Sequence, residues 1–257
     1  TAAVALREAL ADGRPDVRYA AALSLGELAD GGAVEALVHQ LDDRDLMARQ
    51  AAVIALGRIG DPVAVEPLIR ALRDGPPDVR FQAATSLSEL AGDRAVAPLV
   101  EALGDHDLEV RCSAAAALGD LGAAAATEPL ARCLADPVEV VRIEATFALG
   151  RLRDPRAFEP LLALARQRES GFAACELLGA WGDRRALPAL RDVLHKGWFV
   201  PPQNRLRAAA TLVQLGETEA RAYLLDQLRH RRMEVRSLTL ELLGAVAGPA
   251  ALEPLLA

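Results

Sequence analysis

Apolar residues recur at helical spacing throughout this chain. In residues 45–74, Ala52, Leu56 and Ile59 fall at positions i, i+4 and i+7, which is the buried stripe of an amphipathic helix. A second apolar set begins a few residues later and consists of Val65, Leu68, Ile69 and Leu72. Gly60 and Asp61 separate the two sets. The pattern therefore predicts two helices joined by a tight turn, a helical hairpin.

The hairpin pattern repeats along the whole chain. An arginine stands near the start of the first helix, and successive arginines are 31 residues apart from Arg18 to Arg142. The next units step by 29 residues to Gly171, by 34 to Arg205 and by 31 to Arg236. A fixed period of this length is typical of a repeat architecture. Because one hairpin has two apolar faces and cannot bury both, neighbouring hairpins must stack.

We therefore predict an all-α fold, an α-solenoid of about eight stacked hairpins that form a single repeat domain over residues 1–257. The chain begins and ends inside a second helix of the hairpin pattern. We expect it to be truncated within a repeat at both ends.

Several positions carry the same residue type in successive repeats, and we call each such set a column. The residue types indicate how the backbone turns and packs there. Seven residues past the arginine position the residue is always Leu, and eight past it is usually Gly, for example Leu118 and Gly119. A glycine inside a helix costs about 1 kcal/mol relative to alanine, so its recurrence indicates that another backbone comes close there. Gly60 falls where a left-handed residue would end the first helix, and Asp61 follows as an N-cap. Pro67 lies inside the second helix, which we expect to be regular only from about that residue.

Two segments carry a recognisable motif, GRIGDPVAVEPLIRAL (57–72) and DPVEVVRIEATFALGRLRDPRAFEPLL (136–162). They closely resemble the short HEAT repeats named after phycobilisome lyases, and the resemblance runs through the whole chain as about eight units of about 31 residues. It implies a right-handed superhelix in which the first helices form the convex layer and the second helices the concave layer. It also implies that the recurring Arg and Asp residues pair as an interior ladder between adjacent repeats.

Such repeats serve many roles, so the fold by itself leaves the function open. The resemblance favours a non-catalytic scaffold that binds a protein or peptide along its concave face. A bilin lyase or isomerase subunit that holds a tetrapyrrole is the alternative that the family name implies, and a nucleic-acid-binding protein is a second one. HEAT-type iron hydroxylases carry His-Glu pairs, and none of the 4 histidines here is followed by Glu.

Composition narrows these functions further. The net charge of −7 disfavours a nucleic-acid partner, and we interpret the basic cluster RHRRMEVR (229–236) as a solvated turn. The 3 cysteines show no CxxC spacing, which indicates a reducing compartment, taken as the cytoplasm, and no metal site. Charges interrupt every apolar run, so no segment is predicted to span a membrane. We predict that the chain is not an enzyme and has no catalytic residue or cofactor.

The candidate partner-binding residues lie on the second helices. Their positions are not needed to pack the hairpin, and they differ in charge from repeat to repeat, which suits the selection of a partner. They are His39, Arg70, Glu101, Arg132, Asp192 and Asp226. We expect their side chains to line the concave face.

An insert in the sixth repeat is the other candidate site. The segment HKGWFVPPQN (195–204) contains Trp198 and Phe199, and the step to the next arginine is 34 residues instead of 31. Tryptophan is enriched among the residues that dominate interfaces, so this pair is a candidate partner contact. The two aromatic residues can equally fold back as a plug over a packing defect, and both hypotheses stay open. We interpret Trp181, in the same repeat, as core filling.

Overall fold

The structure, a computed structural model, describes residues 2–90, 92–195 and 200–247, and the regular elements in these ranges are all helical. The fold is an all-α solenoid, as predicted. Its repeats group into two compact units, unit 1 (Thr1–Leu152) and unit 2 (Arg153–Ala257), which we describe separately. That the whole chain acts as one repeat domain stays a prediction.

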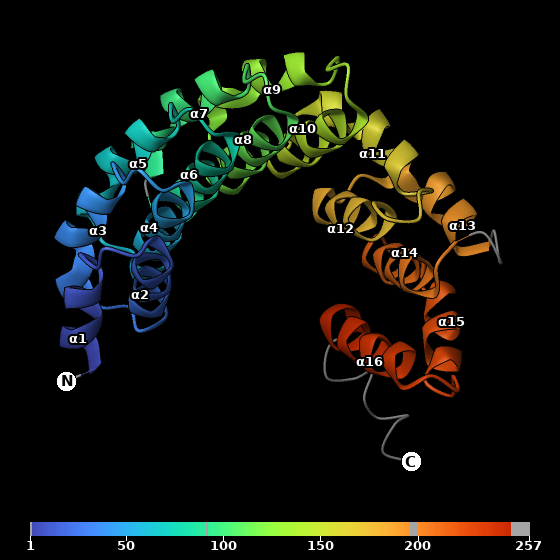
Figure 1. The fold of residues 1–257 in the computed structure, drawn as a ribbon. Helices are drawn as coiled ribbons and strands as arrows, with labels where there is room; N and C mark the ends of the chain where they lie inside the picture. Colours follow the sequence, from blue (N-terminus) through green and yellow to red (C-terminus); the bar gives the residue numbers. More distant parts are fainter. Residues whose placement is uncertain (1, 91, 196–199, 248–257) are drawn as a thin grey trace. The chain divides into compact units, whose positions relative to one another are not determined.

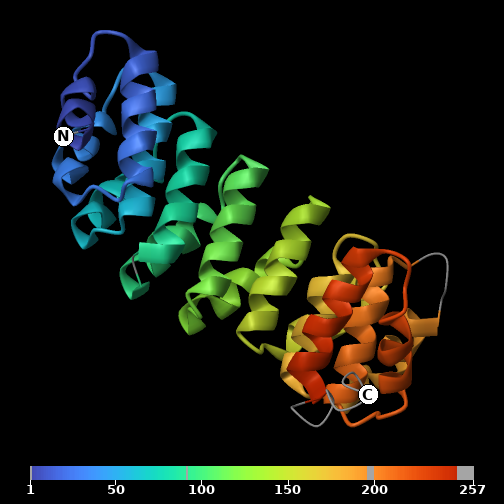
Figure 2. The same ribbon diagram turned by 90° about the horizontal axis from the view of Figure 1, so that it is seen from below.

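Unit 1 consists of two layers of helices (Figure 1). The second helices of the hairpins form one layer: α1 (Ala2–Ala9), α3 (Val34–Gln40), α5 (Val65–Ala71), α7 (Val96–Ala102) and α9 (Thr127–Cys133). The first helices form the other: α2 (Pro15–Glu27), α4 (Leu46–Ile59), α6 (Pro77–Leu90), α8 (Leu108–Asp120) and α10 (Glu139–Arg151). Figure 2 shows these even-numbered helices running side by side.

The described residues of unit 2 repeat the same two layers, with second helices in one and first helices in the other (Figure 1). Its second helices are α11 (Phe158–Leu164), α13 (Leu187–His195) and α15 (Ala220–Gln227). Its first helices are α12 (Gly171–Trp181), α14 (Pro202–Gln214) and α16 (Met233–Ala247). Odd-numbered helices are therefore second helices throughout, and even-numbered helices are first helices.

The first helices begin and end where the sequence pattern indicates. Asp45 caps α4, since its carboxylate accepts a hydrogen bond from the backbone N–H of Ala48 at 3.0 Å. The helix ends at Gly60, which has a φ of 77° and so lies in the left-handed region that glycine adopts without strain. Ala29 occupies the same column after α2 with a φ of 47°, at a steric cost that glycine would not have.

The second helices start in two stages, which explains the recurring proline. Asp61 accepts a hydrogen bond from the N–H of Val63 at 2.9 Å and caps a turn of 3₁₀ helix, Pro62–Ala64. The α-helix α5 follows from Val65, so Pro67 falls in its first turn, where a missing N–H costs nothing. The prediction that this helix is regular only from about Pro67 is confirmed. The other such 3₁₀ turns are Gly31–Ala33, Gly92–Ala95, Ala124–Ala126, Pro155–Ala157 and Arg184–Ala186.

A leucine from each of the helices α2 to α13 fills the space between the layers. The largest side chains with no exposed surface include Leu25, Leu37, Leu56, Leu68, Leu87, Leu99, Leu118, Leu130, Leu149, Leu161, Leu178 and Leu190. Burial of one such side chain contributes about 1.5–3 kcal/mol, so these leucines hold each hairpin together and stack it on the next.

The layer assignment implied by the family resemblance is wrong in unit 1. Figure 1 shows the odd-numbered helices on the outside of the curve of unit 1 and the even-numbered helices on its inside. The physical reason is the size of the contact residues. Gly26 of α2 meets the backbone of Ala55 in α4, and Gly119 of α8 meets Ala148 in α10, so a Cβ added at either glycine would lie 2.8 or 2.7 Å from the alanine Cα. The even-numbered helices thus approach more closely, and the stack bends toward them.

Candidate functional site

The arginine column forms a structural ladder rather than a binding groove. Arg18 donates from Nε to Asp43 Oδ2 at 2.7 Å and from Nη2 to Oδ1 at 2.8 Å, a bidentate pair that links two repeats. Arg80–Asp105 and Arg111–Asp136 repeat this geometry, and Arg49 lies 3.2 Å from Asp74. The side chains in these four pairs are 10–19% exposed. The predicted interior ladder is confirmed.

Each ladder pair also fixes the turn next to it. Arg18 Nη1 donates to the carbonyl of Asp12 at 2.8 Å, and Asp43 Oδ1 accepts the backbone N–H of Asp45 at 2.9 Å. The hydrogen bonds from Arg18 hold the pKa of the Asp43 carboxyl below its usual value. The ladder therefore depends on an ionised carboxylate at each step.

The candidate residues on the second helices lie on the outer side of their units. His39, Arg70, Glu101 and Arg132 are exposed on α3, α5, α7 and α9, so the prediction that they line the concave side of unit 1 is wrong. The assignment failed because the first helices, with their small contact residues, take the inside of the curve. That these four exposed residues bind a partner stays a prediction.

In unit 2, the equivalent residues are on α13 and α15, where Asp192 is half-buried and Asp226 is exposed.

Two of the candidate carboxylates, one in each unit, form ion pairs with the preceding repeat. Glu101 accepts a hydrogen bond from Arg73 at 2.8 Å, and Asp192 accepts one from Arg166 at 3.0 Å. These two carboxylates therefore already form ion pairs between successive repeats.

Trp198 and Phe199 lie outside the described residues. The end of the same insert is built into unit 2, since Val200 and Asn204 are buried. Asn204 Nδ2 donates to the carbonyls of Gln167 and Arg168 at 2.9 and 3.0 Å. It occupies the space beside Gly171, where the repeat lacks its arginine: a Cβ at Gly171 would lie 2.5 Å from Asn204 Nδ2.

Trp181 is half-buried at the end of α12. Its ring packs against that of Phe158 with the ring centroids 5.8 Å apart, and Phe158 is buried. The arrangement agrees with the interpretation of Trp181 as core filling, although one side of the ring system stays accessible.

The inner side of unit 1 carries a row of apolar side chains that the sequence reading overlooked. They stand one or five residues past the ladder arginine, on the side of each first helix opposite the buried leucine. The row consists of Tyr19, Leu23, Ile54, Phe81, Ile143 and Phe147, all half-buried, and we call it the inner apolar row. A helical wheel of the arginine helices would have identified it, because these columns point away from the second helices.

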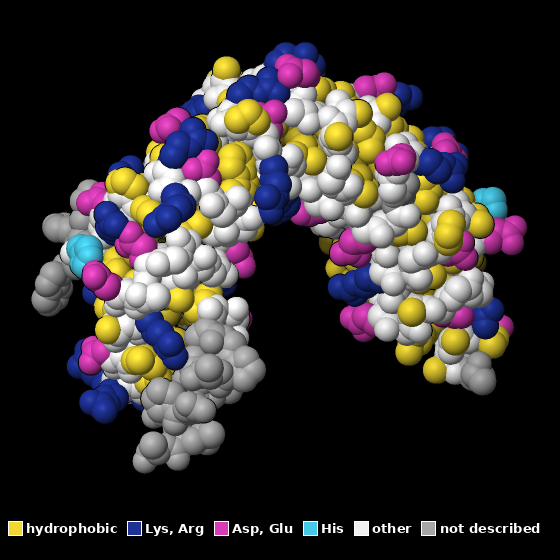
Figure 3. All heavy atoms as spheres, turned by 180° about the vertical axis from the view of Figure 1, so that it is seen from behind, with side chains coloured by type: hydrophobic (Ala, Val, Ile, Leu, Met, Phe, Trp, Pro, Cys, Tyr) yellow, Lys and Arg dark blue, Asp and Glu magenta, His cyan; other side chains and the backbone are white. Residues whose placement is uncertain are grey.

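Charged residues flank the inner apolar row. Nine residues past each ladder arginine stand Glu27, Arg58, Glu89, Asp120 and Arg151, all exposed. Arg151 lies 3.2 Å from Asp120, and burial raises the pKa of the nearby Glu144 carboxyl while Arg151 opposes that shift. An apolar centre with a charged rim is the anatomy of a protein interface. On the face of the molecule in Figure 3, both signs of charge are intermixed rather than gathered by sign.

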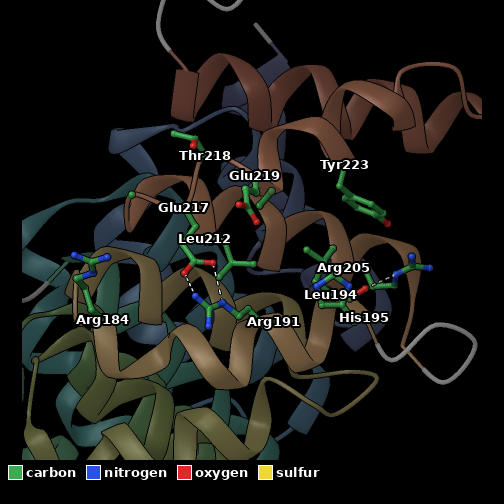
Figure 4. Close-up of a pocket in the computed structure, with 12 residues that line it drawn as sticks. Arg184, Arg191, Leu194, His195, Arg205, Leu212, Glu217, Thr218, Glu219 and Tyr223 are labelled. Carbon is green, nitrogen blue, oxygen red and sulfur yellow. Dashed lines mark hydrogen bonds and ion pairs between the residues drawn. The ribbon is translucent and has the colours of Figure 1, made fainter.

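Unit 2 contains a polar pocket of about 690 Å³ between α13, α14 and α15 (Figure 4). Arg184, Arg191 and Arg205 line it together with Glu217 and Tyr223. Arg191 pairs with Glu217, and the Arg205 guanidinium stacks on the Tyr223 ring, 5.3 Å from its centroid. The pocket is therefore rich in guanidinium groups, which are suited to bind anions.

The described residues offer no metal centre and no activated thiol. In them, no group of three His, Cys, Asp or Glu side chains is placed to hold a metal ion. Burial raises the pKa of the Cys112 thiol to about 11 and that of Cys175 to about 12, and it raises the pKa of Cys133 as well. A thiol is nucleophilic as its thiolate, so these cysteines are poor nucleophiles at neutral pH. Within the same residues, no helix combines the length and the apolar character that crossing a membrane requires.

Comparison with known proteins agrees with this architecture. Residues 3–88, 65–149 and 134–199 match the family model for HEAT repeats. No curated protein sequence matches the chain. A solved structure of the complex of CpcE and CpcF of phycocyanin lyase from Nostoc sp. PCC7120 contains a chain that is 23% identical, with a TM-score of 0.62, covering 95% of this chain and 94% of that one.

Two further solved structures share the fold. The Escherichia coli protein YibA is 24% identical with a TM-score of 0.64, over 83% of this chain and 81% of that one. An engineered protein is 21% identical with a TM-score of 0.51, over 99% of this chain and 81% of that one. At these identities the likeness concerns the fold.

Proposed function

This chain belongs to the HEAT-repeat family, and we propose that it is a non-catalytic scaffold that binds a protein or peptide partner on the inner face of unit 1. The observation that carries the proposal is the inner apolar row. Its six side chains are half-buried although no described helix of unit 1 covers that side, and their charged rim fits a protein partner better than a small apolar ligand.

The chemistry of the described residues supports a binding role over a catalytic one. Their thiols are protonated at neutral pH, and their carboxylates in the ladder are neutralised by arginine. The three aromatic residues of the row, Tyr19, Phe81 and Phe147, have large and rigid side chains that lose little entropy on binding. An acidic surface on unit 1 favours a partner with basic residues around an apolar core, since residues 1–152 carry 24 Asp and Glu against 14 Lys and Arg.

The test compares variants of the two layers. Wild-type protein, Phe81→Ser and Val63→Ser are each immobilised, and partners are captured from a lysate of the source organism and identified by mass spectrometry. Val63 is the matched control, because it is an apolar side chain, 69% exposed, in the 3₁₀ turn before α5 and outside the inner apolar row. We expect a partner that wild type and Val63→Ser retain and that Phe81→Ser loses, with circular dichroism unchanged. Loss with Val63→Ser alone would contradict the assignment.

The outer residues supply a second candidate surface within the same scaffold function. A combined Arg70→Ala and Arg132→Ala variant tests it in the same capture experiment, because both side chains are exposed on second helices of unit 1, α5 and α9. Retention of every partner would leave the inner face as the binding surface.

A tetrapyrrole-binding lyase subunit is the alternative, as the likeness to a phycocyanin lyase chain suggests. Incubation of the purified protein with a bilin separates the two functions: a red-shifted absorbance band that stays with the protein through gel filtration would favour the lyase.

A further inference from the structure

Arg205 is a ladder arginine whose own chain does not provide the ladder carboxylate. Arg18, Arg49, Arg80 and Arg111 each pair with an aspartate 25 residues later, but the residue 25 positions after Arg205 is His230. His230 occupies the same place in the turn as those aspartates. Its Nδ1 accepts the N–H of Arg232 at 3.1 Å, as Asp43 accepts the N–H of Asp45 at 2.9 Å.

The missing carboxylate leaves the Arg205 guanidinium directed to the pocket of unit 2. Its Nε donates to the carbonyl of Leu194 at 3.2 Å, in place of the carboxylate that Nε meets in the ladder, and its plane lies over Tyr223. Among the described residues, no carboxylate forms an ion pair with Arg205. The pocket therefore contains a half-buried guanidinium in the environment that binds a carboxylate elsewhere in this chain.

A second cation stands at the far end of the same pocket. Figure 4 shows Arg184 and Arg205 at opposite ends, with Arg191 between them bound to Glu217. Unit 2 has the opposite charge balance to unit 1, since residues 153–257 carry 15 Lys and Arg against 12 Asp and Glu. Glu217 neutralises Arg191, so the positive charges of the pocket stand apart at its two ends, Arg184 and Arg205, which suits a ligand with spaced carboxylates.

We propose that this pocket binds an acidic peptide segment of a partner protein. One carboxylate of the peptide completes the ladder at Arg205 in trans, and another pairs with Arg184 at the opposite end. A cavity of about 690 Å³ accommodates a few residues of extended chain. The site lies within unit 2 and is independent of the proposed binding face on unit 1.

The experiment measures the dissociation constant of fluorescein-labelled hexaglutamate by fluorescence anisotropy, with hexaglutamine and a ten-residue oligothymidylate as comparison probes. We expect wild type to bind hexaglutamate and not hexaglutamine. Arg205→Gln should weaken binding at least about tenfold, because it removes a charged, bidentate donor. Arg229→Gln, which removes an exposed arginine outside the pocket lining, should change it less than about twofold.

A second variant tests the ladder argument even if Arg205→Gln fails to fold. His230→Asp places the ladder carboxylate in cis, so it should raise the melting temperature and weaken hexaglutamate binding at least about tenfold. Ser237→Asp, which adds the same charge at an exposed position outside the pocket lining, controls for general repulsion.

Several results would overturn the proposal. They are the absence of hexaglutamate binding by wild type, equal losses for Arg205→Gln and Arg229→Gln, and an unchanged dissociation constant for His230→Asp. Oligothymidylate that binds more tightly than hexaglutamate and depends on Arg205 would assign the pocket to nucleic acid instead. Phe81→Ser should leave hexaglutamate binding unchanged, which separates this site from the inner face.

Discussion

Substitution of Gly119 tests whether glycine recurs at this position of the repeat because neighbouring first helices pack too closely for a Cβ atom. A Cβ atom added at Gly119 in α8 would lie 2.7 Å from the Cα and 2.9 Å from the Cβ of Ala148 in α10. Carbon atoms in normal contact are about 3.5–4.0 Å apart, so the two helices must separate by on the order of 1 Å. No rotamer change relieves a clash with backbone. Overpacking costs about 1–3 kcal/mol, of which the helix propensity of alanine offsets about 1 kcal/mol.

We therefore expect Gly119→Ala to lower the free energy of unfolding by up to about 2 kcal/mol, the overpacking cost less the gain in helix propensity. Gly244 in α16 is the matched control, since it stands in the same repeat column and a Cβ there would have no neighbour within 4 Å among the described residues. Gly244→Ala should raise the free energy of unfolding by about 0.5–1 kcal/mol, because helix propensity acts alone.

Urea unfolding followed by circular dichroism at the helical band measures both changes, provided that the slope of the transition stays constant. The two substitutions should move the midpoint in opposite directions. Stabilisation of similar size by both would refute the packing argument and would leave the glycine column without a physical role.

Three further predictions concern the turns, the ladder and the thiols. Ala29→Gly should raise the free energy of unfolding by up to about 1 kcal/mol, because it relieves a φ of 47°, and an unchanged melting temperature would contradict the strain. The pKa of Asp43 is lowered by its hydrogen bonds to Arg18, so its contribution to stability is present above the unfolded pKa and is lost as the pH falls through the folded value. Asp43→Asn should therefore lose less stability than wild type between about pH 5 and pH 2, as measured by urea midpoints; equal losses would argue against the ladder as a stabilising element. With its thiol pKa raised to about 11, Cys112 should react with iodoacetamide at pH 7.5 more than about 100-fold more slowly than a free cysteine, and mass spectrometry of the labelled peptide checks this.

Much of the hairpin could be predicted because its signals are local. Asp61, Pro62 and Gly60 each act within a few residues of themselves, through a cap, a fixed φ and a left-handed φ. The ladder and the glycine column reach one repeat further, and the fixed spacing of 31 residues in the first repeats makes that neighbour predictable. The functional surfaces are different, because a surface depends on which layer is exposed and on which side the stack bends.

The sequence by itself determined the repeat, the helix ends and the buried leucines of this protein, and its resemblance to HEAT repeats added the Arg–Asp pairing. Tertiary structure decided the rest. The side of unit 1 that becomes concave follows from how far apart successive helices stand in each layer, a sum of many contacts that no single motif encodes. In the pocket of unit 2, likewise, Arg205 turns to Leu194 and Tyr223 because His230 takes the position of an aspartate. The Arg205 guanidinium can act as a binding group only because it faces a cavity, and that cavity forms when three consecutive helices, α13, α14 and α15, pack together.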